Sequence, residues 1–460
     1  MQKTTADLFK GLLTVSLLIC MLLPMADHVL AADEAAGEDP VETAFFSGGA
    51  VNGYFENQTA YRANSPNRFS QVRNRLQVEL RSNVREWGRL FLQLRGDYDP
   101  VYDLYTDDFP KTVRDEYRSS LSAENPLKET VREIYLDIPL DTMDIRLGRQ
   151  QVVWGEAIGL RITDVVNPQD YRNFILDDFV DSRIPMWMAR LNYYVDDWTL
   201  ELLWIPQFEP DREALAGSTW EWTFNRIEPP AGMTVRIFDP EKPDANLENS
   251  ETGMRLSGLL AGWNLSLSYL NVWDDMPARH VTFNPRTFSL DVSQKYHRLP
   301  LWGFTFANAF GSFVPRGEFS YARGKYYSTA DPSAVEGLVR KDYLHTMVGT
   351  DYSLADFLFT FQVVQKIILD PDEAIYEESV QTSYSVWIQA NLLHETLKPE
   401  LLAIFSPSDE GWMVRPRVAY AATDTITLSA GADLFSGPPR SFFGQFDTND
   451  QVYVKFKTSF

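Results

Sequence analysis

Short segments in which apolar and polar residues alternate recur along this chain. In the last of them, 452–460, Val454 and Phe456 alternate with Lys455 and Lys457. Successive side chains of a β-strand point to opposite faces, so this pattern predicts a strand with one apolar and one polar face. A strand of that kind suits a wall that separates lipid from water.

About eighteen such strands can be traced, each roughly ten residues long, and sixteen is the alternative count. They are expected at 51–61, 75–81, 90–97, 133–138, 145–154, 187–195, 198–206, 253–260, 265–273, 301–313, 318–327, 342–351, 357–365, 384–392, 401–405, 414–420, 426–434 and 452–460. Beyond residue 32 the sequence contains no apolar run long enough for a membrane helix.

The connections between these segments differ in length. If the chain ends in the periplasm, counting backwards places the tight turns inside and the long connections outside. The long connections are 99–128, 156–185, 207–250, 274–296, 370–379 and 436–450. This sorting is typical of outer-membrane barrels and is not expected of a soluble sandwich. The sequence therefore predicts an all-β fold over residues 49–460, a transmembrane antiparallel β-barrel with short periplasmic turns and long extracellular loops.

The chain ends on the apolar side of its last strand, at Phe460. This ending resembles the C-terminal signal that the barrel-assembly machinery of Gram-negative bacteria reads. The resemblance implies that Phe460 is an assembly signal, that the protein lies in the outer membrane, and that the assembly machinery and outer-membrane lipid are partners.

The N-terminal residues have the character of a secretory leader. A weakly basic start, the apolar run 11–23 and the small residues Ala31 and Ala32 predict a signal peptide over residues 1–32, with an uncleaved anchor as the alternative. The acidic residues that follow predict a flexible periplasmic lead-in over 33–48.

Several functional classes are disfavoured. Cys20 is the only cysteine and lies in the expected leader, so the mature protein has no disulfide, Cys-ligated zinc or covalent haem. A net charge of -22 argues against binding nucleic acid. No nucleotide, metal-binding or catalytic motif occurs, and His280 beside Asp274 and Asp275 is only a faint catalytic candidate. We expect no enzyme activity, no cofactor and no metal.

The most distinctive stretch runs from the end of the 145–154 strand to Pro185. It contains Trp154-Gly155-Glu156, and then Asn167-Pro168-Gln169-Asp170, which predicts a turn or the start of a short helix. Apolar residues such as Phe174 are frequent in it. We therefore expect the connection 156–185 to fold into the barrel mouth, bury these residues and constrict the lumen.

The candidate pore and constriction residues lie in or near this stretch. They are Arg146, Gln150, Trp154, Glu156, Asp170, Asp177, Asp178, Arg190, Arg81 and Arg95. The first four alternate with apolar residues and should face the lumen near the outer rim. Arg190, Arg95 or Arg81 is expected to meet Glu156, Asp177 or Asp178. Three interpretations stay open: an ion-pair lattice that pins the loop, a constriction that contacts solutes, or a divalent-cation site at Asp177, Asp178 and Asp181.

Part of this stretch resembles the domain of unknown function 1302 family of Gram-negative outer-membrane proteins. The matching residues are Gly148, Arg149, Gln150, Trp154, Gly155, Glu156, Asn167, Pro168 and Asp170. The resemblance implies a role in moving hydrophobic molecules, such as lipids or steroid-like compounds, alongside inner-membrane exporters.

The residues themselves predict a hydrated lumen. Positions expected to face it carry charges of both signs, including Arg75, Asp97, Arg255, Arg417 and Asp433. Mixed charge on facing walls favours polar or zwitterionic solutes over a dedicated anion or cation pore. We expect a channel or transporter for small molecules, with a periplasmic or inner-membrane transport partner. The alternative is a plugged barrel that acts as a scaffold for a periplasmic or surface complex.

Overall fold

The computed structural model describes residues 46–224, 226–227 and 229–460. The expected signal peptide and most of the lead-in lie outside the described residues. The first strand begins at Phe46, three residues before the expected start of the barrel at 49.

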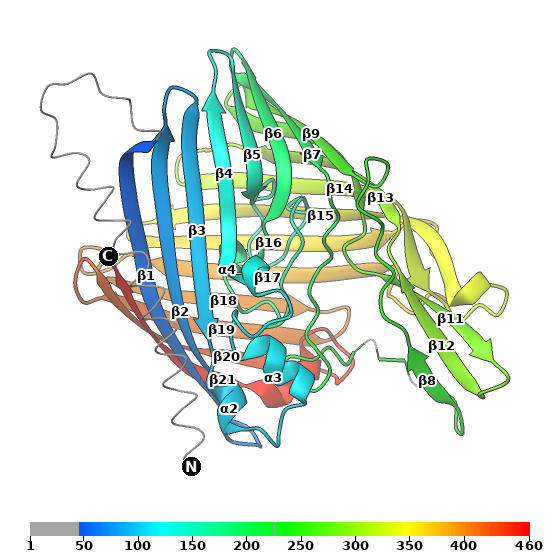
Figure 1. The fold of residues 1–460 in the computed structure, drawn as a ribbon. Coiled ribbons are helices and arrows are strands. Elements are labelled where there is room, and N and C mark those ends of the chain that lie inside the picture. The colour runs from blue at the N-terminus through cyan, green and yellow to red at the C-terminus, as the bar shows by residue number, and fades with distance from the viewer. Residues whose placement is uncertain (1–45, 225, 228) are drawn as a thin grey trace, which may run out of the picture.

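The chain forms an eighteen-stranded sheet that closes on itself (Figure 1). Neighbouring strands are antiparallel throughout, and β1 pairs with β21 to close the barrel. Its strands are β1 (Phe46–Arg62), β2 (Phe69–Val84), β3 (Gly88–Tyr98), β4 (Val131–Pro139), β5 (Met143–Gln150), β6 (Met186–Val195), β7 (Trp198–Ile205), β9 (Glu251–Leu260), β10 (Trp263–Trp273), β13 (Arg298–Ala307), β14 (Phe313–Ser328), β15 (Leu338–Leu354), β16 (Phe357–Ile368), β17 (Val380–Ala390), β18 (Leu397–Ser406), β19 (Gly411–Ala421), β20 (Ile426–Ser436) and β21 (Gln451–Ser459). The predicted fold and the predicted count of eighteen are confirmed.

The remaining elements belong to the loops. Three short strands form a separate sheet beside the barrel, in which β12 pairs with β11 and β8. These elements are α2 (Val101–Leu104), α3 (Lys111–Tyr117), α4 (Pro126–Thr130), α5 (Phe179–Ser182), β8 (Thr234–Ile237), β11 (Ala278–Asn284), β12 (Ser289–Lys295), η1 (Val335–Gly337) and η2 (Gly444–Asn449). No helix in the described ranges is long and apolar enough to cross a bilayer.

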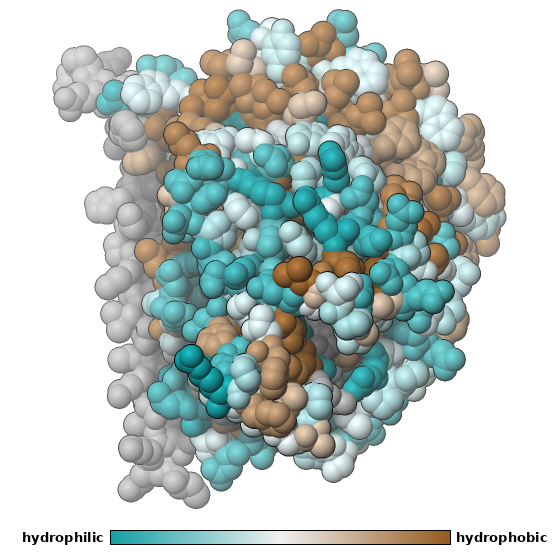
Figure 2. Space-filling model, turned by 90° about the vertical axis from the view of Figure 1, so that its right-hand side faces the viewer, coloured by the Kyte–Doolittle hydropathy of each residue, from teal (hydrophilic) through white to brown (hydrophobic). Residues whose placement is uncertain are grey.

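The residues that alternate along each strand face opposite sides of the barrel wall. On β16, Phe361 and Val363 are 47% and 41% exposed, whereas Gln362 between them is 2% exposed. The phenylalanine faces the surroundings of the barrel and the glutamine faces its interior. Figure 2 shows apolar side chains gathered over the upper part of one face of the molecule and polar ones across its middle.

The barrel is closed at the last residue of the chain. Phe460 exchanges two backbone hydrogen bonds with Gly53 on β1, each 3.0 Å long. Its side chain is exposed on the outer face, in line with Val454. Lys455 lies 3.6 Å from Glu56 on the opposite, inner face. The predicted two-faced terminal strand is confirmed.

The two ends of the barrel differ as the sequence predicts. Two-residue turns such as 196–197 and 355–356 join strands at the periplasmic end. Asp196 and Ala355 have φ of 50° there, the left-handed geometry that such hairpin turns require. The long loops lie at the opposite, extracellular end. The short connection 407–410 between β18 and β19 is also at that end, so the sorting by length is not strict.

The strand predicted at 145–154 is shorter than expected, because β5 ends at Gln150. Two contacts turn the chain inward at this point. The Val152 N–H donates to the Asn167 side chain at 2.7 Å, and the Arg149 Nε donates to the Pro185 carbonyl at 3.1 Å. Trp154 and Glu156 therefore belong to the loop that follows and not to the barrel wall.

Candidate functional site

The connection between β5 and β6, residues 151–185, runs through the inside of the barrel. We call this segment the inner loop. Trp154 is buried against Met186 and Leu203 near the start of the loop. A Cβ on Gly253 would lie 3.1 Å from the Trp154 ring, so the glycine leaves room for the indole.

The inner loop then reaches strands far away along the sheet. The Glu156 N–H donates to the Glu318 carboxylate on β14, and the Ile158 N–H donates to the Gln362 side chain on β16 at 3.2 Å. Gly159 has φ of 78°, and a Cβ there would lie 2.9 Å from Ile404 on β18. The loop therefore crosses the lumen from β5 to β18.

One buried carboxylate holds the crossing segment. Glu318 also accepts hydrogen bonds from Thr163, at 3.2 Å from the backbone N–H and 2.7 Å from the hydroxyl. Next to it, Arg183 donates to Asp164 at 2.6 Å, with both side chains buried. A buried charge is costly unless it is hydrogen-bonded or paired. Glu318 is satisfied by hydrogen bonds from neutral donors, and Asp164 by its ion pair with Arg183.

Asn167 joins the beginning of the inner loop to its end. Besides accepting from Val152, its amide donates to the Ile184 carbonyl at 2.9 Å and the Gln150 carbonyl at 3.3 Å. The sequence marked this residue as part of a turn motif. Its bridging contacts depend on backbone groups that only the fold brings together.

A second part of the inner loop packs on aromatic side chains. Phe174 is buried with ring centroids 4.6 Å from Phe446 and 5.0 Å from Phe442. Ile404 and Met413 on the barrel wall belong to the same cluster. The predicted burial of the apolar residues holds for Val166 and Phe174, whereas Ile175 and Leu176 are half-buried and Val180 is exposed. Apolar side chains thus fill the lumen beside β18 and β19.

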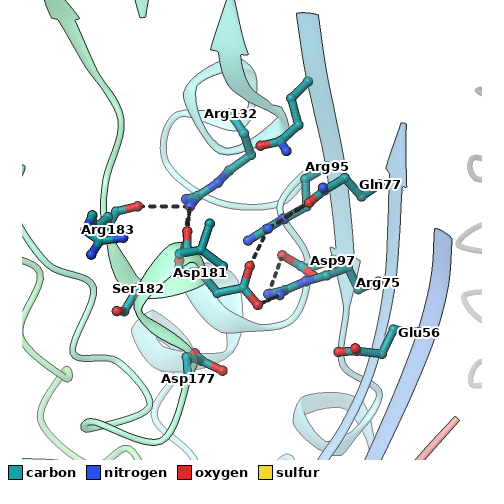
Figure 3. Close-up of polar contacts among 12 residues, drawn as sticks. Glu56, Arg75, Gln77, Arg95, Asp97, Arg132, Asp177, Asp181, Ser182 and Arg183 are labelled. Carbon is teal, nitrogen blue, oxygen red and sulfur yellow. Dashed lines mark hydrogen bonds and ion pairs between the residues drawn. The ribbon is translucent and has the colours of Figure 1, made fainter. Parts of the chain in front are cut away.

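Four arginines of β2, β3 and β4 reach the inner loop, and we call them the arginine wall: Arg73, Arg75, Arg95 and Arg132. Figure 3 shows Arg75, Arg95 and Arg132 around Asp181. Asp181 of the inner loop lies between two of them, with Arg75 at 2.8 Å and Arg95 at 2.5 Å. Arg132 donates to the backbone carbonyls of Asp181 and Arg183 at 3.1 and 2.9 Å. The helix α5 is thereby fastened to β2, β3 and β4.

Two neighbouring carboxylates complete this network. Asp177 accepts from Arg73 at 2.9 Å, and Asp97 accepts from Arg75 at 2.6 Å. Burial alone would raise the pKa of Asp181, but the guanidinium groups of Arg75 and Arg95 outweigh it and hold that pKa well below its usual range. The inner loop is therefore pinned by charges that stay ionised.

The divalent-cation interpretation does not fit these contacts. Asp177 and Asp181 are each engaged by arginine, and Asp178 is exposed at the start of α5. No group of three or more His, Cys, Asp or Glu side chains in the described part of the chain is arranged to hold a metal ion. Guanidinium groups occupy the place that a cation would need.

Asp170 belongs to a different network, among the extracellular loops. It accepts from Arg172 at 2.5 Å, and Arg172 also lies 3.3 Å from Glu129 of α4. Glu129 accepts in turn from Arg212, at 2.5 Å, in the connection between β7 and β9. These contacts bind the inner loop to two other loops and not to a solute path.

The remaining predicted residues lie on the barrel wall or behind the loop. Arg146 pairs with Asp137 at 2.6 Å, and Arg190 pairs with Glu201 at 2.8 Å, each on the next strand. Arg81 is exposed and lies 3.1 Å from Glu79. None of Arg190, Arg81 and Arg95 therefore forms an ion pair with the expected carboxylates Glu156, Asp177 or Asp178 in the described residues. Arg95 reaches the inner loop, but its partner there is Asp181.

Gln150 and Trp154 are buried, at 0% and 2% exposure, so neither lines an open path. The Gln150 amide donates to the Met188 carbonyl at 3.2 Å. The alternation predicts both residues on the inner face of a strand, but Gln150 is the last residue of β5 and Trp154 is packed inside the inner loop.

Glu156 is exposed at the edge of an open recess of about 350 Å³. The recess lies between the inner loop and the wall formed by β7, β9, β10 and β13. Its lining includes Arg255, Ser257 and Asn264, and it reaches Asp197 in a periplasmic turn. It is thus a polar space on the periplasmic side of the inner loop.

His280, the faint catalytic candidate, is buried in the extracellular loops. It hydrogen-bonds Glu336 of η1 through Nδ1, and its Nε2 lies 3.0 Å from the Nε2 of His297. Asp274 pairs with Lys325 at 2.5 Å instead. The histidine links two loops and is not placed beside the acidic residues near it in sequence.

The fold is similar to that of solved outer-membrane proteins. OccAB2 of Acinetobacter baumannii is 11% identical, with 91% of this chain and 99% of that chain covered and a TM-score of 0.53. OccK8 (OprE) of Pseudomonas aeruginosa is 9% identical, with 90% and 98% covered and a TM-score of 0.51. A BenF-like porin from Pseudomonas fluorescens Pf-5 is 10% identical, with 91% and 99% covered and a TM-score of 0.50.

At these identities the likeness concerns the fold. A closed barrel of this kind, with an apolar outer face, is a protein of the Gram-negative outer membrane. A search of curated protein sequences finds no match. The model of one family, described as protein of unknown function (DUF1302), matches residues 29–423. The chain therefore belongs to the DUF1302 family, and its barrel is of the outer-membrane porin type.

Proposed function

We propose that this protein is an outer-membrane channel for small solutes and that the inner loop sets its narrowest part. The observation that carries the proposal is the path of residues 151–185 across the lumen, with a polar recess left beside it. A closed barrel with charged and polar residues on its inner face is compatible with passage from the extracellular to the periplasmic side.

The two sides of the inner loop have different roles in this proposal. The ion pairs of Asp177 and Asp181 with the arginine wall hold the loop in place. Glu156 faces the recess and is the candidate that contacts a solute. The other predicted residues position the loop or strengthen the wall, and none is proposed to act in catalysis.

A hydrophobic solute is the second candidate, favoured by the aromatic cluster around Phe174. Rings of this cluster meet Ile404 and Met413 on the barrel wall. The cluster is buried, so a lipid-like molecule would have to displace the loop from it. Such displacement would replace aromatic contacts with contacts to the solute.

Uptake into proteoliposomes tests the proposal. We expect small radiolabelled sugars and amino acids to enter vesicles that contain the protein faster than vesicles that contain protein denatured by boiling. Extraction of the purified protein with organic solvent tests the second candidate, which predicts retained lipid or sterol. No uptake and no retained lipid would contradict both candidates and favour a plugged scaffold.

Two partner predictions belong to the same proposal. Recognition of Phe460 by the barrel-assembly machinery would precede insertion, and a periplasmic or inner-membrane transport partner would meet the periplasmic end. Pull-down from envelope extracts with and without residues 33–40 tests the second of these.

A further inference from the structure

The recess beside the inner loop has the dimensions of a small-molecule site. Its volume of about 350 Å³ is at the lower end of the range for ligand pockets. Hydroxyl and amide groups line it, including those of Thr199, Ser257, Asn264 and Thr305. It is open, so a solute can enter it without a change in the barrel.

Two opposite charges, Glu156 and Arg255, line this space within electrostatic range of each other, but no hydrogen bond or ion pair joins them. The Glu156 backbone N–H is bonded to Glu318, whereas its carboxylate makes no hydrogen bond or ion pair within the described ranges. The guanidinium of Arg255 on β9 likewise makes none there, and its Nε is buried.

Several charges on the barrel wall, in contrast, form ion pairs across neighbouring strands. Arg190 and Glu201 lie 2.8 Å apart, Arg417 and Glu400 lie 2.6 Å apart, and Arg415 pairs with Asp433 at 2.7 Å. Glu201 is the register partner of Arg255 across β7 and β9, but Arg190 already engages it. Arg255 is therefore available to a group that enters the recess.

A charged group in a partly buried site needs a partner of opposite charge or water. Arginine presents a planar fork that matches a carboxylate with two parallel hydrogen bonds. A carboxylate such as that of Glu156 accepts hydrogen bonds from an ammonium group. An anion alone would bind Arg255 close to the repelling charge of Glu156, and a cation alone would bind Glu156 close to Arg255.

We propose that the recess is a binding subsite for small zwitterions, with the solute carboxylate on Arg255 and its ammonium group on Glu156. The proposal rests on the proposed channel function and names its solute class. Binding and passage are separable, because a subsite at the edge of the lumen can be measured without any flux.

Titration calorimetry on the full-length protein in detergent tests the subsite. The probe is 4-aminobutanoate, and butanoate and butylammonium are matched ions that each lack one charge. We expect 4-aminobutanoate to bind more tightly than either. Glu156→Gln and Arg255→Gln should each weaken its binding by about tenfold or more, the range for a charge-assisted hydrogen bond.

Controls separate the subsite from the general charge of the lumen. Glu400→Gln and Arg417→Gln neutralise a paired glutamate and arginine on another part of the wall and should leave binding unchanged. Should a neutral variant fail to fold, Glu156→Asp and Arg255→Lys keep the charge and should retain measurable binding. The recess of the Glu156→Gln variant should come to bind butanoate better than butylammonium. The recess of the Arg255→Gln variant should show the opposite order.

Equal affinities for butanoate and 4-aminobutanoate would overturn the proposal. So would an affinity for 4-aminobutanoate that is unchanged in Glu156→Gln and Arg255→Gln, or no binding to the folded protein. These outcomes differ from failure of the channel itself, which is absence of solute flux. A protein that conducts but does not bind the zwitterion keeps the first proposal and loses the second.

Discussion

At the scale of single residues, Asn167 has a larger role than its place in a turn motif indicates. One side chain satisfies the backbone of Val152, Gln150 and Ile184 at the two ends of the inner loop. The motif was visible in the sequence. Its partners were not predictable, because they meet only after β5 and β6 pair.

Replacing Asn167 by Leu should loosen the inner loop. The change leaves buried backbone groups without partners, which costs about 1–3 kcal/mol for each unsatisfied group. Hydrogen exchange of residues 151–185 measures the effect as faster exchange. Asn246→Leu, at an exposed position in another loop, is the control and should leave these rates unchanged. Equal exchange in both variants would contradict the bridging role.

We expect Asp211 to make the attachment of the inner loop dependent on pH. It accepts from the Gln169 N–H at 2.6 Å, and burial raises its pKa to about 7. Burial and the nearby Asp211 also raise the pKa of Asp275. A carboxyl group whose pKa is higher in the folded than in the unfolded state favours folding while it is protonated. This contribution is complete at acid pH and is lost as the pH rises through the pKa of the folded state.

The opening free energy of the Gln169 amide, from hydrogen exchange, should therefore fall by about 1–2 kcal/mol between about pH 5.5 and pH 8.5. Asp211→Asn keeps the accepting oxygen but cannot ionise, so it should weaken this dependence. If the opening free energy of this amide depends on pH as strongly in Asp211→Asn as in the parent protein, other groups cause the dependence.

At the scale of elements, α5 fastens the inner loop to the arginine wall. The sequence predicted that Arg95 could meet Glu156, Asp177 or Asp178, whereas its partner in the loop is Asp181, at 2.5 Å. It did not identify Arg73 and Arg75 as the further partners, because the tilt and register of β2 decide which of its inward residues reach the loop.

Asp181→Asn should change the ion selectivity of the lumen. The substitution removes the negative charge that compensates Arg75 and Arg95. The reversal potential in a KCl gradient should therefore shift toward the equilibrium potential of chloride. Asp178→Asn is a matched control, since Asp178 has the same charge and lies on the same helix turn but makes no ion pair in the described residues. Equal shifts for the two variants would contradict a specific role for Asp181.

At the scale of the whole molecule, alternation was sufficient to predict a closed barrel and its strands. Phe361 and Gln362 differ in exposure because neighbours on a strand face opposite sides, a rule that needs no tertiary information. The inward path of the inner loop was predictable in outline from its apolar residues. Its anchors were not, because Glu318 is more than one hundred and fifty residues away from Glu156 and Thr163.

The central claim is that residues 151–185 narrow a conducting path. Gln150 and Met186 are register partners, so a short Gly-Ser linker in place of residues 160–183 can still join β5 to β6. A control variant with residues 279–294 replaced in the same way shortens the hairpin of β11 and β12, which belongs to the separate sheet.

Single-channel conductance in planar bilayers is the most direct measurement. The account predicts a small conductance for the parent protein, a clearly larger one for the variant without residues 160–183, and no increase for the hairpin control. Equal conductance of the parent protein and the variant without residues 160–183, or no conductance from any of the three proteins, would contradict the claim that the inner loop narrows a conducting path.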